Sequence, residues 1–326
     1  MEKIDILLAT YNGEAYLVEQ LDSILKQTYK DFNLIVSDDN SNDATLKILE
    51  QYAKRDSRIT IFKQEKNLGV ISNFEFLLSK VKSKYFMFSD QDDIWNENKI
   101  EKTFNKIQET NSDIIFTDLN VVDDKLNVLY DSYWELKGFK NKILKYNSFE
   151  ALYLNNYVTG CTMLMKKDII PKVLPLPKNS KYVLHDYWIA LIISQSGKVE
   201  FLNESTIKYR QHKNNSVGSK KKTKSLNTLS EIRKLFIDVK KEHFSVFIKN
   251  EDKFEKQETR DLNRQALEYY KNLEKHKYIS FKYWKVFKKL YKYEERKYTL
   301  ENFLILNLPL LVSPIFRIRK LLKRSN

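Results

Sequence analysis

Three carboxylates lie within four residues in the segment Ser89–Trp95 (SDQDDIW), directly after the apolar run at 86–88. Like-charge repulsion and desolvation make such a cluster costly at the end of a buried strand. A divalent cation that carries a diphosphate would offset this cost, because hard cations bind carboxylate and phosphate oxygens together. The alternative is a polar turn in which Asp92 or Asp93 caps a helix that starts near Asn96.

Polar residues also end three other predicted strands. The apolar runs at 3–10, 33–37, 59–62 and 85–89 are each followed by a helical pattern. This alternation predicts a doubly wound, mostly parallel α/β sheet, in which ligands bind beyond the carboxyl ends of the strands. The polar residues lie at these ends, at Thr10 to Asn12, Asp38 to Ser41, Asn67 to Gly69 and Asp90 to Asp93. Their coincidence favours a binding site over four unrelated turns.

The first predicted strand is not followed by a glycine-rich phosphate loop. Neither GxGxxG nor GxxxxGK[ST] occurs there, so a Rossmann-type dinucleotide site and a P-loop are not supported. A nucleotide at this edge must therefore be held by side chains and a metal ion.

The pattern after residue 96 is less regular. We expect a helix at about 97–110, strands at 113–123 and 158–165, a helix from His185, and short strands at 199–201 and 207–209. The aromatic-rich residues 125–157 are expected to be irregular. The single cysteine, Cys161, is expected to be a core residue and fits a reducing compartment. The strand-like start of the chain predicts no signal peptide.

The basic charge of the chain is confined to its last third. The formal net charge is +14; residues 1–219 carry 29 Lys and Arg against 30 Asp and Glu, and residues 220–326 carry 28 against 13. The change falls at the lysine-rich segment 220–224. We therefore expect a domain of residues 1–219 and a basic helical domain of residues 220–326 that faces phosphates.

The segment 303–316 is apolar, but it is about half as long as a transmembrane helix and contains Pro309 and Pro314. Basic residues follow it, which is typical of an interfacial membrane anchor. The alternative is a helix that packs on the core or on a second subunit.

Five motifs together resemble glycosyltransferase family 2 with the GT-A fold. They are residues 9–14 (ATYNGE), 21–29 (LDSILKQTY), 37–41 (SDDNS), 67–70 (NLGV) and 89–95 (SDQDDIW). The resemblance covers roughly residues 1–215 and implies a GT-A-type α/β fold with a C-terminal helical extension. The SDQDDIW motif together with YRQH at 209–212 also resembles bacterial rhamnosyltransferase-like enzymes of cell-surface polysaccharide assembly.

The resemblance implies a role for each matching residue. Thr10, Tyr11 and Asn12 would meet the base and ribose, with Tyr11 stacked on a pyrimidine. Asp39 would accept a hydrogen bond from the base, which favours uracil or thymine over a purine. Asp90 would contact the ribose side of the nucleotide.

The same resemblance assigns Asp92 to a divalent metal, Mn²⁺ or Mg²⁺, and His212 to the neighbourhood of the metal and diphosphate. Asp186 matches the catalytic base; its alternative is a helix N-cap. Glu14 and Asn73 match weaker nucleotide-sugar positions. The alternatives are a surface imidazole for His212 and support of a helix start for Asn73.

These residue types suit glycosyl transfer. A sugar that leaves a nucleoside diphosphate generates an anion, which a metal at Asp92 would stabilise. The acceptor hydroxyl must lose a proton, so one carboxylate, Asp186, should stand apart from the metal. Direct attack with one base inverts the anomeric configuration. We therefore expect an inverting, metal-dependent glycosyltransferase.

The expected donor is a UDP- or dTDP-sugar, with rhamnose as a candidate sugar. The expected acceptor is a glycan or polyprenyl-linked glycan of a bacterial cell-surface polysaccharide. The enzyme is expected in the cytoplasm, peripheral at the inner membrane face, with the C-terminal helices binding membrane or forming homo-oligomers. A nucleic-acid-binding protein is one alternative, but it predicts basic residues throughout the fold. A catalytically inactive domain fused to partner-binding helices is another, against which the intact Asp90, Asp92 and Asp186 argue.

Overall fold

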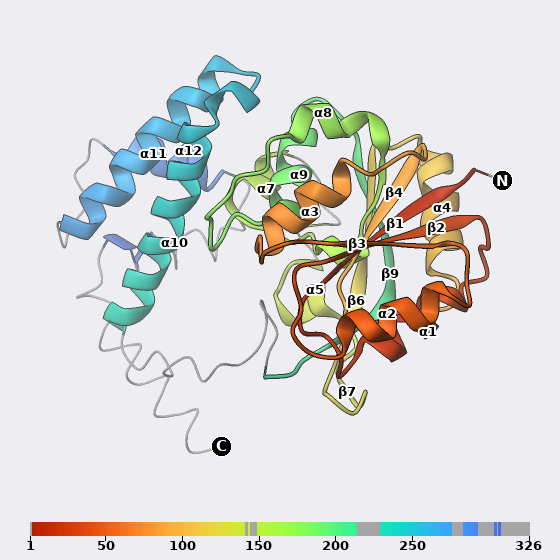
Figure 1. Ribbon diagram of the computed structural model, residues 1–326. Coiled ribbons are helices and arrows are strands. Elements are labelled where there is room, and N and C mark those ends of the chain that lie inside the picture. The colour runs from red at the N-terminus through yellow and green to blue at the C-terminus, as the bar shows by residue number, and fades with distance from the viewer. Residues whose placement is uncertain are drawn as a thin grey trace. The chain divides into compact units, whose positions relative to one another are not determined.

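The computed structural model describes residues 2–140, 143, 149–213, 229–275, 283–292, 303–304 and 306–307. The chain forms two compact units, one of Met1–Asn179 with Leu184–Ser219 and the other of Ser180–Val183 with Lys220–Asn326 (Figure 1). The strands are β1 Ile4–Thr10, β2 Phe32–Asp38, β3 Ile59–Lys63, β4 Tyr85–Ser89, β5 Ile94–Trp95, β6 Ile114–Val122, β7 Val128–Tyr130, β8 Leu164–Lys166 and β9 Val199–Arg210. The helices of the first unit are α1 Leu17–Leu25, α2 Thr45–Ala53, α3 Val70–Leu78, α4 Lys99–Thr110, α5 Tyr133–Leu136, α7 Phe149–Leu154, α8 Ile170–Val173 and α9 His185–Ile193.

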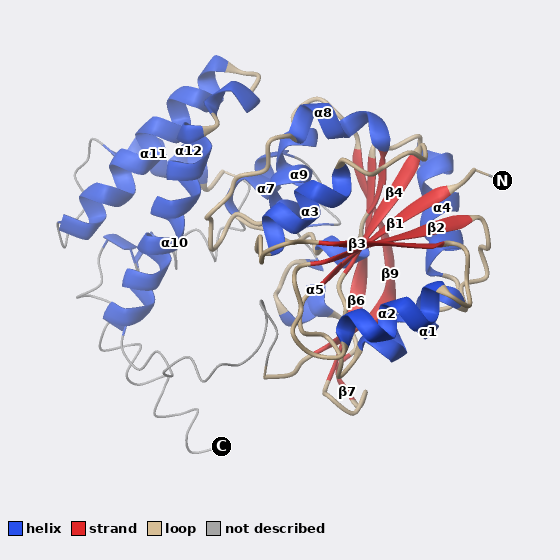
Figure 2. Cartoon of the chain, viewed as in Figure 1, coloured by secondary structure: helices blue, strands red, loops and turns tan. Residues whose placement is uncertain are grey.

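A nine-stranded mixed sheet forms the centre of the first unit. Its order is β3-β2-β1-β4-β8-β6-β9-β5, with β7 paired to β6. The first four strands are parallel to one another, as are β6 and β9, whereas β8 is antiparallel to β4 and β6. Helices α1, α2 and α4 lie on one side of the sheet, and α3, α8 and α9 on the other (Figure 2). The expected α/β sheet is confirmed.

The central strands are apolar on both faces because both faces are covered by helices. In β1, Ile6, Leu7 and Leu8 are all fully buried. Ile6 and Leu8 belong to one core cluster with Leu21 of α1 and Ile100 of α4. This packing holds β1 between its parallel neighbours β2 and β4, so the polar carboxyl ends of the three strands lie next to one another.

Three expectations of local structure were wrong. Residues 158–165 do not form one strand; Gly160–Thr162 is a 3-10 turn, η1, and β8 begins at Leu164. The two short strands at 199–201 and 207–209 are one strand, β9. The polar residues in the middle of β9 led us to predict two separate strands. The structure shows that pairing with β6 continues through this part, with a shift in register. The segment 125–157 contains β7, α5 and α7 rather than only loop.

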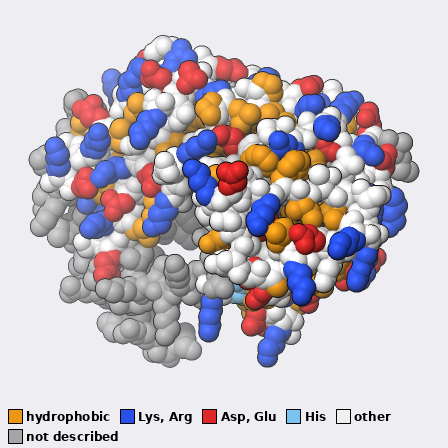
Figure 3. Space-filling model, in the orientation of Figure 1, with side chains coloured by type: hydrophobic (Ala, Val, Ile, Leu, Met, Phe, Trp, Pro, Cys, Tyr) orange, Lys and Arg blue, Asp and Glu red, His pale blue; other side chains and the backbone are white. Residues whose placement is uncertain are grey.

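Lys and Arg side chains of the first unit are interspersed with Asp and Glu on the face that Figure 3 shows. This distribution agrees with the balanced charge of residues 1–219. A nucleic-acid-binding surface requires a basic patch, which this face does not present among the described residues.

The second unit contains α10 Leu229–Lys249, η3 Glu251–Lys253, α11 Gln257–Lys275 and α12 Trp284–Leu290. Its core is aromatic and includes Phe244, Phe247, Tyr269 and Phe287. Ser180–Val183 joins this unit because the Glu242 carboxylate accepts hydrogen bonds from the backbone amides of residues 181 and 182, at 2.5 and 3.0 Å, and from the Ser180 hydroxyl.

The lysine-rich segment 220–224 and most of the apolar segment 303–316 lie outside the described residues. Among the helices that are described, none combines the length and the hydropathy needed to cross a bilayer. The expected membrane anchor therefore stays a prediction.

Candidate active site

The carboxyl ends of β1, β2 and β4 lie side by side in the sheet. Thr10 pairs with Asp38 in the register of β1 and β2, and Leu8 pairs with Ser89 in that of β1 and β4. The segments that follow these strands contain seven of the ten residues expected at the site, namely Thr10, Tyr11, Asn12, Glu14, Asp39, Asp90 and Asp92. The sheet therefore brings together candidate site residues that lie about eighty positions apart in the sequence.

Asp38 organises the first two of these ends. Its carboxylate accepts a hydrogen bond from the Thr10 hydroxyl, at 3.0 Å, and from the Ser41 amide and hydroxyl, at 3.0 and 2.6 Å. Asp38 is fully buried and Thr10 is nearly so. Thr10 thus anchors the start of the loop after β1 to Asp38. Its neighbours Tyr11 and Asn12 are exposed and form the rim of the candidate site.

Asp39 shapes the third strand end. Its carboxylate oxygens accept hydrogen bonds from the backbone amides of Leu68 (2.7 Å) and Gly69 (2.9 Å). Each oxygen has two lone-pair positions, so a further donor such as the N–H of a base can still be accepted. Asn73 of α3 donates to the Ser37 carbonyl at 3.0 Å, which ties α3 to β2.

Asn12 and Glu14 join the loop after β1 to the loop after β2. Asn12 has a positive φ of 48°, donates from its amide to Ser41 and accepts from the Asn42 amide. The Glu14 carboxylate accepts from the Ala44 amide at 2.7 Å, at the start of α2. These contacts give Asn12 and Glu14 a structural role at the rim of the site.

Gln91, the middle residue of the acidic motif, connects that motif to the Tyr11 backbone. Its side-chain oxygen accepts from the Tyr11 amide at 2.8 Å, and its side-chain nitrogen donates to the Tyr11 carbonyl at 3.0 Å. A Cβ atom on Gly13 would lie 2.2 Å from the Gln91 side-chain oxygen, so a larger residue at position 13 would displace the Gln91 side chain. The Tyr11 side chain itself is 46% exposed and free to stack on a ligand. The sequence alone indicates no role for Gln91.

The acidic motif concentrates negative charge as expected. Burial, followed by the charges of Asp92 and Asp186, raises the pKa of Asp90 to about 7. Burial and the charges of Asp92 and Asp90 raise the pKa of Asp93 well above its usual range. The fold therefore brings Asp186 close enough to Asp90 for their charges to interact, although ninety-six residues separate them in the chain. Such a cluster is stabilised by a cation.

Asp92 and His212 form the pair that best fits a divalent cation. The His212 Nε2 atom lies 2.8 Å from Asp92 Oδ2, and the two side chains are only 9% and 14% exposed. The imidazole packs on the ring of Tyr16, with the ring centroids 4.4 Å apart. Carboxylate oxygen and imidazole nitrogen are ordinary ligands of Mn²⁺, and the neighbouring carboxylates supply the required negative charge.

Arg210 holds the acidic loop from beneath and was missed as a site residue by sequence reasoning. It is 2% exposed, and its guanidinium donates to the carbonyls of Asp92 and Asp124, each at 2.9 Å. It also pairs with Glu19 of α1, and its backbone amide donates to Asp93. Its position in the YRQH segment, two residues before His212, could have identified Arg210 as a residue near the site.

Asp186 lies in the first turn of α9, with its side chain almost buried. One carboxylate oxygen accepts from the Gly160 amide at 3.0 Å and the other from the Tyr187 amide at 2.6 Å. The N-cap of α9 is Leu184, so Asp186 is not the capping residue. These two amides hold the carboxylate in one orientation, and its charge acts on Asp90 of the acidic motif.

Tyr133 is a second aromatic residue near Asp186 that sequence reasoning did not single out. Burial and the charge of Asp186 raise the pKa of its hydroxyl. It starts helix α5, which is capped by Ser132 and tied to the buried Asp118 in the middle of β6. The irregular-looking segment after residue 125 therefore does contribute to the site.

Comparison with known proteins agrees with this arrangement. A family model described as glycosyl transferase family 2 matches residues 5–174. The dTDP-rhamnosyl transferase RfbG of Shigella flexneri is 30% identical over 225 residues, which cover 65% of this chain and 74% of that protein.

Two solved structures share the fold. TarS 1-349 of S. aureus in complex with UDP-GlcNAc has a TM-score of 0.57 at 16% identity, covering 89% of this chain and 80% of that chain. The mannosyltransferase PcManGT from Pyrobaculum calidifontis, in complex with GDP-Man and Mn²⁺, has a TM-score of 0.53 at 12% identity, covering 83% and 74%.

The fold and its acidic edge thus define a nucleotide-sugar transferase of the GT-A type, with helices added at the C-terminal end. The chain belongs to glycosyltransferase family 2. The resemblance drawn from the five motifs is confirmed.

Proposed function

We propose that this glycosyltransferase inverts the anomeric configuration as it transfers a sugar from a pyrimidine nucleoside diphosphate to a hydroxyl of a bacterial cell-surface glycan. The observation that carries the proposal is the convergence of Asp90, Asp92 and Asp186, with His212 bound to Asp92. A metal-bound leaving group and a separate base require these group types at one site.

Asp92 and His212 are the residues proposed to hold the divalent cation, Mn²⁺ or Mg²⁺. A bound cation would stabilise the negative charge of the departing nucleoside diphosphate. Asp90 lies beside this pair and is proposed to meet the ribose. Tyr11 is proposed to stack on the base and Asp39 to accept the hydrogen bond from its N–H, which would select a pyrimidine.

Asp186 is proposed to be the base. The acceptor oxygen forms a bond to the anomeric carbon from one side as the bond to the diphosphate breaks on the other, and the acceptor proton passes to the Asp186 carboxylate. The backbone amides of Gly160 and Tyr187 keep that carboxylate fixed, which reduces the reorganisation needed at the moment of transfer.

The donor proposed first is a dTDP-sugar, with dTDP-rhamnose as the leading candidate and UDP-sugars as the next. The support is the similarity to a dTDP-rhamnosyl transferase that is 30% identical and of which the chain covers 74%. The Asp39 position agrees with either thymine or uracil.

Thermal stabilisation by nucleotides tests the proposal directly. The purified chain is melted with dTDP, UDP or GDP and their sugars, each with and without Mn²⁺, because a ligand that binds the folded state raises the melting temperature. We expect metal-dependent stabilisation by a pyrimidine diphosphate, and its loss in Asp92→Ala. Stabilisation by GDP alone would contradict the pyrimidine assignment, and full metal-dependent turnover by Asp92→Ala would contradict the metal site.

Asp186→Asn is the matched variant for the base. It keeps the size of the side chain and the amide hydrogen bond to one oxygen, loses the amide hydrogen bond to the other, and removes the proton acceptor. We expect nucleotide binding to persist and turnover to fall by about 10²-fold or more. Equal loss of binding and turnover would point to a structural role.

The proposed setting is the inner face of a bacterial membrane, with a polyprenyl-linked acceptor and the basic second unit against anionic lipid or a second copy of the chain. The excess of 28 basic over 13 acidic residues in 220–326 supports it. Deletion of residues 303–326 should release the protein from anionic liposomes in sedimentation. Unchanged sedimentation would exclude this segment as the anchor, and light scattering of the same variant reports any oligomer.

A further inference from the structure

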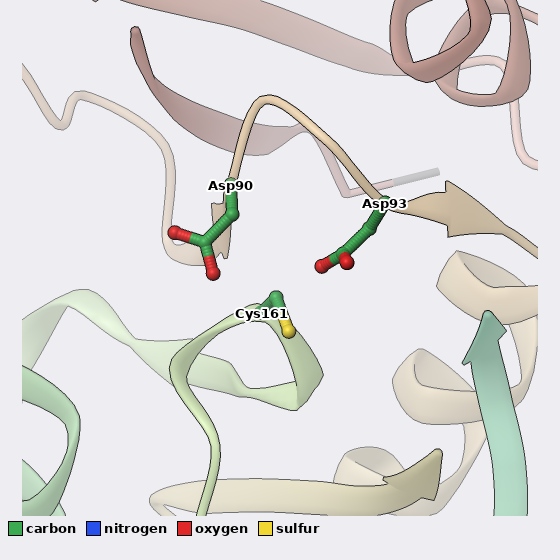
Figure 4. Close-up of side chains that lie close together, drawn as sticks. All are labelled: Asp90, Asp93 and Cys161. Atoms are coloured by element: carbon green, nitrogen blue, oxygen red, sulfur yellow. The ribbon is translucent and has the colours of Figure 1, made fainter. Parts of the chain in front are cut away.

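Two carboxylates of the acidic motif and the single cysteine lie close together and could bind a metal ion. One carboxylate oxygen each of Asp90 and Asp93 and the sulfur of Cys161 all lie within 4.8 Å of one another. Figure 4 shows both Asp side chains extending from the loop between β4 and β5 toward η1, the turn that contains Cys161. Asp93 and Cys161 are 0% and 1% exposed, whereas Asp90 is partly exposed.

Asp93 has a buried oxygen aimed into this cluster. Its Oδ1 accepts a hydrogen bond from the Arg210 amide at 3.2 Å. Its Oδ2 is buried and receives no N–H or O–H donor from the described residues, and the Cys161 thiol is the polar side chain that interacts with this carboxyl group. A buried carboxylate oxygen without a donor costs free energy, which a bound cation would offset.

We propose that Asp90, Asp93 and Cys161 form a site for a thiophilic divalent cation of the Zn²⁺ or Cd²⁺ type, separate from the Mn²⁺ or Mg²⁺ site at Asp92 and His212. A thiolate selects zinc-like metals over the harder Mg²⁺ and Mn²⁺, which prefer carboxylate, phosphate and water oxygens. The two sites therefore differ in the metals they favour.

The geometry suits a tetrahedral ion with small adjustments. Zn–S and Zn–O bond lengths place neighbouring ligand atoms about 3.5 Å apart. Because the three ligand atoms here all lie within 4.8 Å of one another, only a small contraction of the cluster is needed. Side-chain rotation of the partly exposed Asp90 can supply most of this. The same residue gives the ion an entry path, and the fourth position is open to water.

Lys99 is the cation that competes with such an ion. Its buried Nζ atom lies 3.7 Å from the centroid of the Trp95 ring and has no hydrogen-bond partner among the described residues. Its charge interacts with those of Asp93 and Cys161. Removal of this ammonium should therefore strengthen metal binding.

Occupancy of the site would inhibit sugar transfer. Asp90 would be drawn from the nucleotide toward the thiolate, so the inhibition should be competitive with the donor. This consequence rests on the proposed function, whereas metal binding itself does not.

Metal titration of the full-length protein tests the proposal. The chain has one cysteine, so any thiolate-to-metal charge-transfer absorption must come from Cys161. The protein is freed of metal with a chelator, kept reduced with a phosphine and titrated with Cd²⁺, then with Co²⁺, whose visible spectrum reports coordination geometry. We expect an ultraviolet thiolate band that saturates at one equivalent of Cd²⁺.

Variants separate this site from the transferase site. Cys161→Ser should remove the band and reduce Cd²⁺ affinity in calorimetry about tenfold or more, yet retain Mn²⁺-dependent turnover that Zn²⁺ no longer inhibits. Lys99→Met should tighten Cd²⁺ binding. His212→Ala should lose Mn²⁺ affinity but keep the band.

Two results would overturn the proposal. One is the absence of a thiolate band with excess Cd²⁺, and the other is equal Cd²⁺ affinity of the native protein and Cys161→Ser. A normal band in a protein without transferase activity would leave the metal site standing and refute only the proposed function.

Discussion

At the scale of single residues, the site depends on side chains that hold backbone as much as on those that face the ligand. Gln91 makes two hydrogen bonds to the Tyr11 backbone, and this contact exists because Gly13 leaves room for it. The acidic motif and the loop after β1 are therefore held together.

Gln91→Ala should weaken donor binding without removing a reacting group. The loss of two hydrogen bonds, each contributing about 1 kcal/mol, should raise KM for the donor several-fold while kcat changes little. Steady-state kinetics with the donor varied gives both constants. A fall in kcat with unchanged KM would contradict a positioning role.

Gly13→Ala should produce the same defect, because its Cβ would force the Gln91 side chain away. The double variant Gly13→Ala with Gln91→Ala should then be no worse than either single variant, since both changes break one contact. Additive losses in the double variant would show that Gly13 is needed for another reason.

The sequence predicts residues of this site by chemical type but not by partner. Asp90 and Asp92 are identifiable because a cluster of carboxylates after an apolar strand is costly without a partner. Asp186 is identifiable only because it matches the position of the catalytic base in the family that the motifs resemble. Gln91 and Arg210 were missed because their partners are backbone atoms of Tyr11, Asp92 and Asp124, which no side-chain pattern reveals.

At the scale of elements, β1 to β4 and their helices were predicted well because both sheet faces are buried and the strands are continuous apolar runs. The prediction failed at β9 and η1. In β9 the polar middle is held by pairing with β6, and in η1 an apolar sequence turns because the Gly160 amide is bound by Asp186. Both outcomes depend on tertiary contacts.

Strand β9 ends in Arg210, which links α1, the acidic loop and the β6–β7 turn. Arg210→Lys retains the charge but cannot reproduce a planar guanidinium that reaches the carbonyls of Asp92 and Asp124 and the carboxylate of Glu19. We expect Mn²⁺ affinity, measured by electron paramagnetic resonance, to fall about tenfold and the melting temperature to drop by a few degrees.

Glu19→Gln is the matched control for Arg210. Glu19 is half exposed, so its ion pair with Arg210 contributes little and the variant should bind Mn²⁺ nearly as well as the native chain. If Glu19→Gln were as damaging as Arg210→Lys, the ion pair rather than the carbonyl contacts would position the loop.

At the scale of the whole molecule, the cluster of carboxylates makes stability depend on pH. Burial, with the charges of Asp92 and Asp186, raises the folded-state pKa of Asp90 to about 7, compared with about 3.9 in an unfolded chain. A group with a raised folded-state pKa favours the folded state fully below its unfolded pKa, and this contribution is lost as the pH rises toward the folded pKa. The metal-free protein should therefore lose stability between about pH 4 and pH 7.

The test compares melting temperatures of the native chain and Asp90→Asn across that range, each without metal and with Mn²⁺. Asp90→Asn cannot ionise, so its melting temperature should fall less between pH 5 and pH 7 than that of the native chain. Glu50→Gln, on the exposed side of α2, is the control and should follow the native curve. Mn²⁺ should restore most of the lost stability in the native chain at pH 7, because the cation offsets the repulsion among the carboxylates. Parallel curves for the native chain and Asp90→Asn would mean that Asp90 is ionised throughout, and that the charge of the acidic motif is already balanced within the protein.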